Sequence, residues 1–235
     1  MAPVTEVVLL TLVPDEHSTA GSAIKESVKI LAQQPGCLAV RASRLLERPD
    51  ELHYFIDWDL VDSHFAFARN KDAYTPFRAI VNFFMAGYAS PYHVSLSPFP
   101  PTVFDQGGES GTVLVLKAWF PGGQALTAEE MDAVSEMFAA FGRVLRDKEV
   151  EGFNGRVAQG WSLEDNISFK GEENRVFLFA AGWESWETNS SFCTKQFKEM
   201  SSGIADLKKL RILDVCSINT ADNVVHINAV VENED

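Results

Sequence analysis

The sequence predicts an α+β protein made of two similar halves, and three observations support this prediction. The segment HYFIDWDLVDSHFAF in the first half is echoed by FLFAAGWESWETNSSF in the second. In each copy an apolar run closes on a tryptophan, Trp58 or Trp183, and leads into a helical pattern. Each half also opens with an apolar run that ends at a proline, Pro14 or Pro121. A repeat of this kind indicates two copies of one structural unit.

The first half starts with a strand, a helix and a second strand. Residues Val7 to Val13 are too short a run for a helix and suit a buried strand. Apolar residues at helical spacing follow, at Ile24, Val28 and Leu31, and the residues QQPG end that helix. An extended segment is then predicted from Cys37 to Leu46.

The rest of this half supplies two more strands around a second helical region. His53 to Trp58 is the third strand, and a helical pattern follows it to about Gly87, interrupted at Pro76. Tyr92 to Leu96 is the fourth strand. The order β-α-β-β-α-β is that of a ferredoxin-like unit, in which two helices leave one sheet face uncovered.

A proline- and glycine-rich segment separates the halves, and the second half repeats the order. Its predicted elements are a strand at 113–120, a helix that begins at Thr127, strands at 153–161 and 175–183, a helical region at 187–207 and a strand at 212–218. Thr127 and Glu130 have capping-box spacing. Between the proline and tryptophan landmarks the second copy is longer, and the extra residues are expected in its first helix and in the EDNISFKGEEN hairpin.

These elements divide the chain into four parts. The predicted domains are 1–97, a linker at 98–111, a second unit at 112–220 and an extension at 221–235. In the extension, VVHINAVV alternates enough for an edge strand, and the final ENED is expected to be disordered.

Composition narrows the classes of partner and compartment. The chain has 33 acidic and 20 basic residues, so nucleic acid and anionic membranes are disfavoured as partners. No apolar run approaches the length of a spanning helix. Its three cysteines lack metal-ligand spacing, which indicates free thiols in a reducing compartment. We therefore expect a cytoplasmic protein that is a monomer or a homodimer.

Three segments give the chain a family resemblance. PGCLAVRASRLLERPDELHYFIDWDLVDSHFAF and YHVSL in the first half, and GWESWETNSSF in the second, resemble the dimeric α/β-barrel superfamily, within it the antibiotic-biosynthesis-monooxygenase-like (ABM-like) proteins, particularly fungal tandem versions. The resemblance implies that the two ferredoxin-like units pack sheet to sheet as an intramolecular barrel around a hydrophobic pocket. Proteins of this family include cofactor-free oxygenases, while related barrels carry out cyclisations and isomerisations. The resemblance therefore implies cofactor-free oxygenation or one of these other reactions.

Strand alternation predicts which residues line that pocket. One face of the first sheet is polar and contains Arg41, Ser43, His53, Asp57, His93 and Ser95. In the second copy, Leu178 and Ala180 replace His53 and Phe55. Phe55, Tyr92 and Trp161 complete the predicted substrate contacts, so the pocket would hold a hydrophobic molecule against a few polar groups.

The predicted catalytic residues are His93, Asp57 and Arg41. Imidazole changes protonation near neutral pH, so His93 is the first candidate for an acid or base. Asp57 could orient it and Arg41 could stabilise an enolate; a structural histidine and an ordinary Asp–Arg salt bridge are the alternatives. His64 is expected to be a helix cap or surface residue, and Trp58 and Trp183 are expected to be packing anchors.

The function predicted from these residues is a cofactor-independent enzyme of natural-product metabolism, acting on a polyketide-like or terpenoid-like molecule. Monooxygenation is the first interpretation, and a cyclase or isomerase, including a pericyclase, fits the same pocket. A small-molecule binding protein without catalysis is the remaining alternative. The sequence has no phosphate-binding loop, no GxSxG and no paired metal-ligand spacing, so no cofactor or metal is expected.

Overall fold

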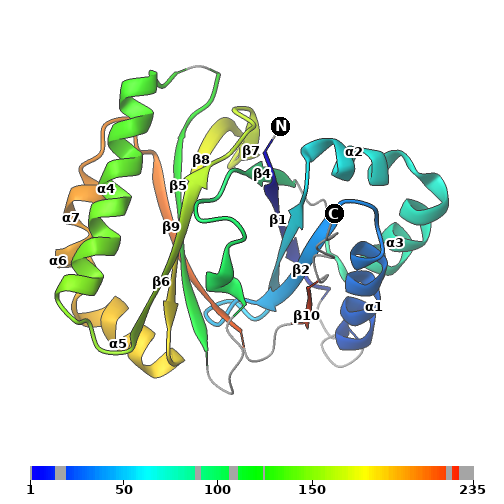
Figure 1. Cartoon of the computed structure of the whole chain (residues 1–235), viewed down its shortest axis with the longest axis horizontal. Helices are drawn as coiled ribbons and strands as arrows, with labels where there is room; N and C mark the ends of the chain where they lie inside the picture. Colours follow the sequence, from blue (N-terminus) through cyan, green and yellow to red (C-terminus); the bar gives the residue numbers. More distant parts are fainter. Residues whose placement is uncertain are drawn as a thin grey trace, which may run out of the picture. The chain divides into compact units, whose positions relative to one another are not determined.

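The computed structural model describes residues 2–13, 20–87, 91–105, 111–123, 125–220 and 224–227 (Figure 1). They form two compact units. The first contains the chain up to His93 together with one strand near the C-terminus, and the second begins at Val94. Each unit has the α+β, ferredoxin-like element order that the sequence predicts.

The first unit is a five-stranded sheet in the order β10-β2-β3-β1-β4, with its helices on one face. Its elements are β1 (Val4–Thr11), α1 (Ala20–Ala32), β2 (Cys37–Arg44), β3 (Glu51–Trp58), α2 (Val61–Arg69), α3 (Lys71–Phe84), β4 (Tyr92–Val94) and β10 (Val224–Ile227). The predicted strands and the first helix are confirmed, while Pro14, expected to end the first strand, lies outside the described residues.

The second helical region differs from the prediction. It divides at Asn70, which ends α2 and caps α3 by accepting a hydrogen bond from the backbone N–H of Ala73 at 3.4 Å. Pro76 lies inside α3 and does not interrupt it. The bond that Pro76 cannot make would go to the carbonyl of Asp72, an exposed residue of the first turn, so its loss does not break the helix.

The helix-facing side of the first sheet forms this unit's core. Alternate residues of the central strands, among them Val40, Tyr54 and Ile56, pack against α1 and α3. Trp58 is fully buried and stacks on Phe67 with ring centroids 6.2 Å apart. Its predicted role as a packing anchor is confirmed.

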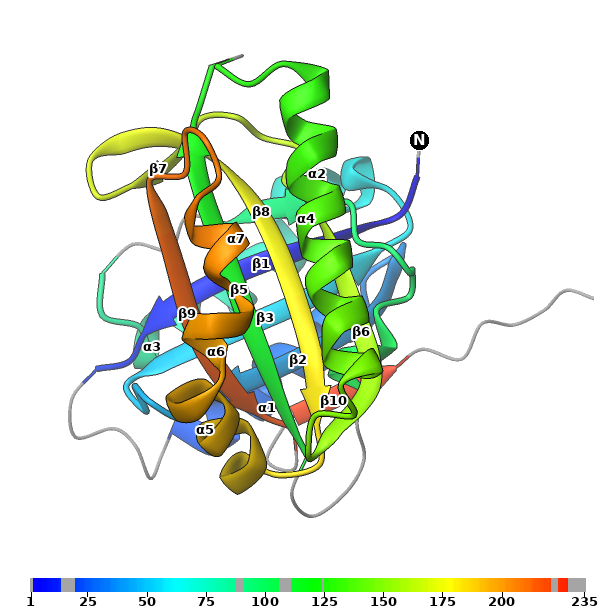
Figure 2. The same cartoon turned by 90° about the vertical axis from the view of Figure 1, so that its left-hand side faces the viewer.

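The second unit repeats the arrangement with a longer first helix, and its helices cover one face of its sheet (Figure 2). Strands run in the order β6-β8-β5-β9, and β7 pairs with β8 as a hairpin. The elements are β5 (Thr112–Pro121), α4 (Ala128–Asp147), β6 (Phe153–Trp161), β7 (Ile167–Phe169), β8 (Glu172–Trp183), α5 (Trp186–Lys195), α6 (Phe197–Met200), α7 (Ser202–Ala205) and β9 (Ile212–Asn219).

The extra residues of the second copy lie where the sequence predicts. Helix α4 has 20 residues against 13 in α1, and β7 forms the added hairpin. The predicted capping box is present: Thr127 accepts from the backbone N–H of Glu130 at 3.2 Å, and the Glu130 carboxylate accepts from that of Thr127 at 2.9 Å. These bonds satisfy two amide groups at the helix start.

Aromatic rings fill the helix-facing side of the second sheet. Phe138, Phe177 and Phe179 are buried there with ring centroids 4.8–5.8 Å apart. Trp183 is fully buried against Phe192, so its predicted role as a packing anchor is also confirmed.

Two segments connect or extend the units. In the described part of the predicted linker, a short 3-10 helix, η1 (Thr102–Phe104), lies against β6 and β8, with Val103 and Phe104 buried. The predicted edge strand of the extension is confirmed as β10, which pairs with β2 of the first unit. The final ENED lies outside the described residues, and the four domain boundaries given above stay predictions.

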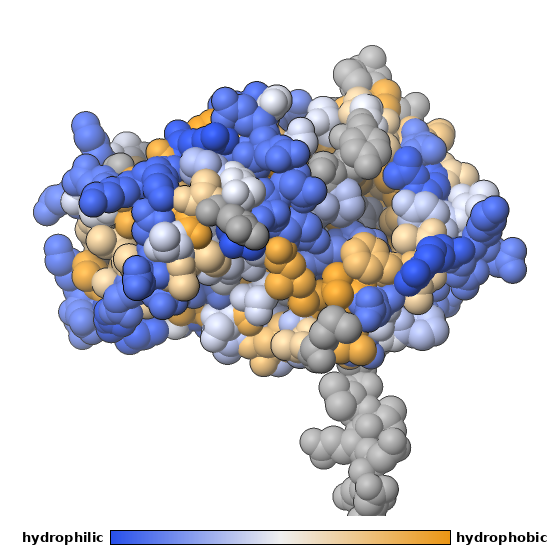
Figure 3. All heavy atoms as spheres, turned by 90° about the horizontal axis from the view of Figure 1, so that it is seen from above, coloured by the Kyte–Doolittle hydropathy of each residue, from blue (hydrophilic) through white to orange (hydrophobic). Residues whose placement is uncertain are grey.

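On the face shown in Figure 3, hydrophilic residues dominate, with hydrophobic patches between them. Among the described residues, no helix has both the length and the apolar character that crossing a membrane requires.

Candidate active site

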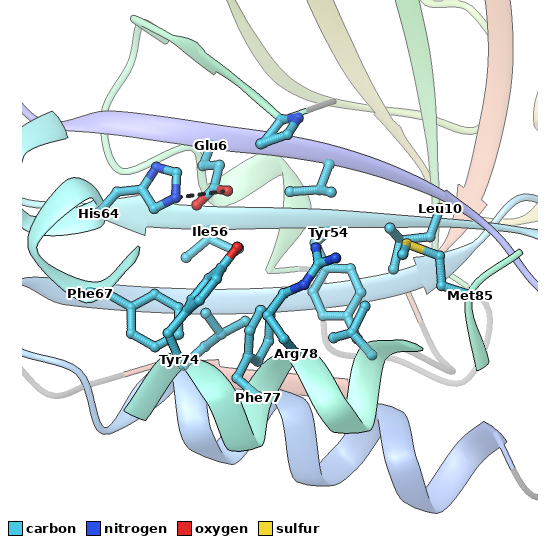
Figure 4. A pocket seen from close by; sticks show the side chains of 14 residues that line it. Glu6, Leu10, Tyr54, Ile56, His64, Phe67, Tyr74, Phe77, Arg78 and Met85 are labelled. Carbon is cyan, nitrogen blue, oxygen red and sulfur yellow. Dashed lines mark ion pairs between the residues drawn. The ribbon is translucent and has the colours of Figure 1, made fainter. Parts of the chain in front are cut away.

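The first unit contains a cavity of about 360 Å³ between its sheet and its helices (Figure 4). Its sheet wall is formed by Glu6, Val8, Leu10, Tyr54 and Ile56. Its helical wall includes His64 and Phe67 of α2 and Tyr74, Phe77, Arg78 and Val81 of α3. The size and largely apolar lining are typical of a small-molecule site.

The polar end of this pocket is a chain of three buried or nearly buried side chains, Glu6, His64 and His93. His64 Nδ1 lies 2.7 Å from His93 Nε2, and His64 Nε2 lies 3.5 Å from Glu6 Oε1. The other carboxylate oxygen of Glu6 accepts a hydrogen bond from Trp58 Nε1 at 2.9 Å. We call these residues the Glu6–His64–His93 chain.

Each member of this chain is held by a different element. Glu6, Val8 and Leu10 occupy alternate positions of β1, so their side chains share the helix-facing side of the sheet. His64 lies in the first turn of α2 and stacks on Trp58, with ring centroids 5.6 Å apart. The side chain of His64 is 13% exposed, so it borders both the core and the pocket.

The same three residues have donor atoms that can bind a metal, all within 4.8 Å of one another. A metal ion needs ligand atoms that converge on one point. Here His64 Nδ1 lies at hydrogen-bond distance from His93 Nε2 and His64 Nε2 faces Glu6, so a metal ion would have to replace the contact between the two histidines. The geometry therefore fits a linear path for protons better than a metal centre.

Two tyrosines border the pocket, and their hydroxyl groups differ in surroundings. The hydroxyl of Tyr54 bonds Ser27 Oγ at 2.7 Å, and Ser27 donates to the carbonyl of Ile24, so Tyr54 is already engaged. Burial raises the pKa of Tyr54, which keeps it protonated. Tyr74 instead stands on α3 with its ring against Phe67 and its hydroxyl directed towards the sheet side of the pocket.

The predicted catalytic pair Arg41 and Asp57 forms a buried ion pair on the opposite side of the same sheet. Arg41 Nη1 lies 2.7 Å from Asp57 Oδ2, and the hydroxyl of Thr5 donates to Asp57 Oδ1 at 2.7 Å. Thr5 and Glu6 are neighbours on β1, so their side chains point to opposite faces. Arg41 and Asp57 therefore do not reach the pocket, and their catalytic role stays a prediction.

The structure corrects the placement of His93. The sequence puts it on one face with Asp57 and Arg41, whereas its ring bonds His64 on the helix-facing side. Strand β4 has only three residues, and a shift of one residue in its pairing moves every side chain to the other face. Ser95 lies beyond β4 and is exposed, so its predicted contact with a substrate stays a prediction.

The other predicted contacts are distributed over both units. His53, Phe55 and Ser43 are buried on strands β2 and β3 away from the pocket, and Tyr92 is buried in β4. Leu178 and Ala180 are buried on β8, on the side away from Phe177 and Phe179.

Trp161 belongs to the helix-facing side of the second unit. Its indole Nε1 donates to Ser135 Oγ at 3.1 Å and its ring packs on Phe120 and Phe177. Trp161 is therefore held in this unit by ring packing and by its indole hydrogen bond.

The sequence analysis did not assign four of the residues at this pocket to the site. Glu6 precedes the predicted start of the first strand, although an acid in an otherwise apolar run was a usable signal. His64 was expected at a cap or on the surface and is instead in the middle of the buried chain. Tyr74 and Arg78 share one face of α3 with Phe77 and Val81, which becomes visible only once the helix is known to pass through Pro76.

Comparison with known proteins gives a fold and no closer relationship. A solved structure named anthrone oxidase-like protein matches 93% of this chain and 91% of its own, with a TM-score of 0.64 and 14% identity. A protein of Fusobacterium nucleatum named "Putative monooxygenase" has a TM-score of 0.61 and 13% identity, covering 93% and 92% of the two chains. The likeness is one of fold.

A third structure, from Lactobacillus acidophilus and bearing the same name, covers 97% of both chains at a TM-score of 0.57 and 10% identity. No protein-family model matches the sequence, and no curated protein does. Because these structures match almost the whole chain, the two-unit α+β architecture is shared along its full length.

Proposed function

We propose that this protein is a cofactor-independent oxygenase that binds a hydrophobic small molecule in the pocket of the first unit. The observation that carries the proposal is the Glu6 carboxylate beside His64 at one end of an otherwise apolar cavity. A buried base next to an apolar surface suits removal of a proton from a carbon acid.

The chemistry requires a proton acceptor and a stabilised carbanion. The Glu6–His64 pair accepts one proton from a carbon of the substrate. The contact between His64 Nδ1 and His93 Nε2 gives that proton a path away from the pocket. The delocalised carbanion then reduces dioxygen. For a substrate CH₂ group oxidised to C=O, one oxygen atom enters the product, and the other leaves as water with the two hydrogens that the carbon loses.

The reaction class takes support from the solved structures of the same fold, two of which are named as monooxygenases and one as anthrone oxidase-like. The resemblance to ABM-like proteins leads to the same class and to a role in natural-product metabolism. The fungal tandem subtype and the packing of the units as a barrel belong to this proposal as well.

The test is aerobic and anaerobic incubation of metal-stripped protein with anthrone, a carbon acid with an oxidisable CH₂ group, followed by mass spectrometry under ¹⁸O₂. We expect enzyme-dependent oxygen uptake above the spontaneous rate, with one labelled oxygen in the product. Val8→Phe, which fills the pocket, should abolish the enzymatic rate, whereas Val8→Ala at the same position should retain it.

Other outcomes separate the alternatives. A product of unchanged mass that forms without oxygen from other carbonyl compounds would favour a cyclase or isomerase. Saturable binding without any turnover, abolished by Val8→Phe, would favour a binding protein. Oxygen uptake that survives Val8→Phe would contradict a reaction in this pocket.

A further inference from the structure

Arg78 places a positive charge in the pocket that the proposed reaction does not use. It rises from α3 and points into the cavity, where it is half-buried among apolar walls (Figure 4). Within the part of the chain that the structure describes, its guanidinium makes no hydrogen bond or ion pair. A guanidinium in such surroundings has five donors available for a ligand.

The carboxylate in the same pocket does not compensate for this charge. Glu6 accepts from Trp58 and lies beside His64, so it is already engaged at the polar end of the pocket. Arg78 therefore remains as the charged group that the protein leaves for a ligand. Since the whole chain carries a net charge of −13, any preference of the pocket for an anion has to arise locally.

Tyr74 adds a second donor on the same helix face. It precedes Arg78 by four residues, which is one turn of the helix, so the two side chains are neighbours above the cavity. The hydroxyl of Tyr74 makes no hydrogen bond to any residue that the structure describes. A guanidinium with a phenol beside it is suited to bind the oxygens of one anionic group.

We propose that Arg78, assisted by Tyr74, makes this pocket selective for hydrophobic ligands that carry one anionic oxygen group, such as a carboxylate. The apolar walls bind the ring system and Arg78 binds the anion. This inference rests on the proposed function for the identity of the pocket as a ligand site. It adds a preference among ligands: neutral molecules such as anthrone enter the pocket, and those with an anionic group bind more tightly.

The test uses two fluorescent probes that share their aromatic rings and differ in charge. These are 1-anilinonaphthalene-8-sulfonate, which carries one anionic group, and N-phenyl-1-naphthylamine, which carries none. We expect Arg78→Gln to weaken binding of the sulfonate about tenfold or more and to change binding of the neutral probe less than about twofold. Tyr74→Phe should weaken the sulfonate by a smaller factor.

Lys71→Gln is the matched control, because it removes one positive charge from an exposed position on the same helix, outside the pocket. It should leave the affinity of both probes unchanged, and Val8→Phe should reduce both. The proposal is overturned if Arg78→Gln weakens both probes equally, if Lys71→Gln matches its effect, or if sulfonate binding survives Val8→Phe. Loss of oxygen uptake with intact anion selectivity would contradict only the proposed reaction.

Discussion

Among single residues, Asp57 offers the clearest contrast between a structural and a catalytic role. Its carboxylate bonds both Arg41 and Thr5 in a buried setting, so Asp57→Asn removes a charge partner of the buried Arg41 guanidinium. We expect this variant to lose about 3–5 kcal/mol of unfolding free energy, measured by urea denaturation. Asp72→Asn, which changes an exposed acid on α3, should cost less than about 1 kcal/mol.

A double variant separates the cost of an unbalanced buried charge from the contribution of the ion pair itself. Replacing both partners, as in Arg41→Met with Asp57→Leu, removes both buried charges together and should cost less than Asp57→Asn alone. If the double variant is instead less stable than Asp57→Asn, then charge balance alone does not explain how the ion pair contributes to the unfolding free energy.

Cys37 tests the electrostatics of the same region. Burial and the nearby carboxylates of Asp57 and Glu6 raise the pKa of this thiol to about 12. At pH 8 only about one molecule in ten thousand would carry the reactive thiolate. Cys193 is half-buried on α5, and none of the three cysteines forms a disulfide.

We therefore expect iodoacetamide at pH 8 to modify Cys193 while Cys37 stays unmodified, as followed by peptide mass spectrometry. Because a raised thiol pKa favours the protonated form, protection should persist at pH 9 and decline only as the pH approaches 12. In 6 M urea all three cysteines should react. Equal rates for Cys37 and Cys193 in the native protein would show that the thiol is not shielded.

At the scale of elements, β10, near the end of the chain, adds a strand to the sheet of the first unit. It pairs with β2 in the register Val224 to Ala42 through Ile227 to Ala39, and so covers what would otherwise be a sheet edge. Removing residues 221–235 should expose the β2 amides that β10 covers. We expect faster hydrogen exchange in residues 39–42 and a greater tendency to aggregate, while exchange in the second unit stays unchanged. Unaltered exchange in β2 would contradict this pairing.

Elements were predicted well where the local sequence determines them. The spacing of Thr127 and Glu130 determined where α4 begins, and the apolar runs determined β3 and β8. The helix that contains Pro76 was predicted poorly, because the lost hydrogen bond involves the carbonyl of an exposed first-turn residue and Asn70 offers a better cap. Orientation in β4 depends on pairing with a distant strand, which alternation within three residues does not determine.

At the scale of the whole molecule, the two copies have diverged in how they use the space between sheet and helices. In the first unit that space is a cavity with a polar chain at one end. In the second it holds the rings of Phe138, Phe177 and Phe179. The repeat in the sequence correctly predicted two units. The polar residues that stand out in the sequence, His53, Asp57 and Arg41, lie on the sheet face opposite the pocket, so the sequence analysis assigned the site to that face.

The central claim is that the chemistry occurs on the helix-facing side of the first sheet, and two matched pairs of variants test it directly. The measurement is the rate of oxygen uptake with the aromatic carbon acid used above, per folded molecule. Glu6→Gln and His64→Gln should lower it by about 10²-fold to 10⁴-fold, as loss of a general base predicts. Asp57→Asn and His53→Gln remove the same groups on the opposite face and should retain the rate within about threefold. The reverse pattern, with activity lost in the second pair and kept in the first, would contradict the account.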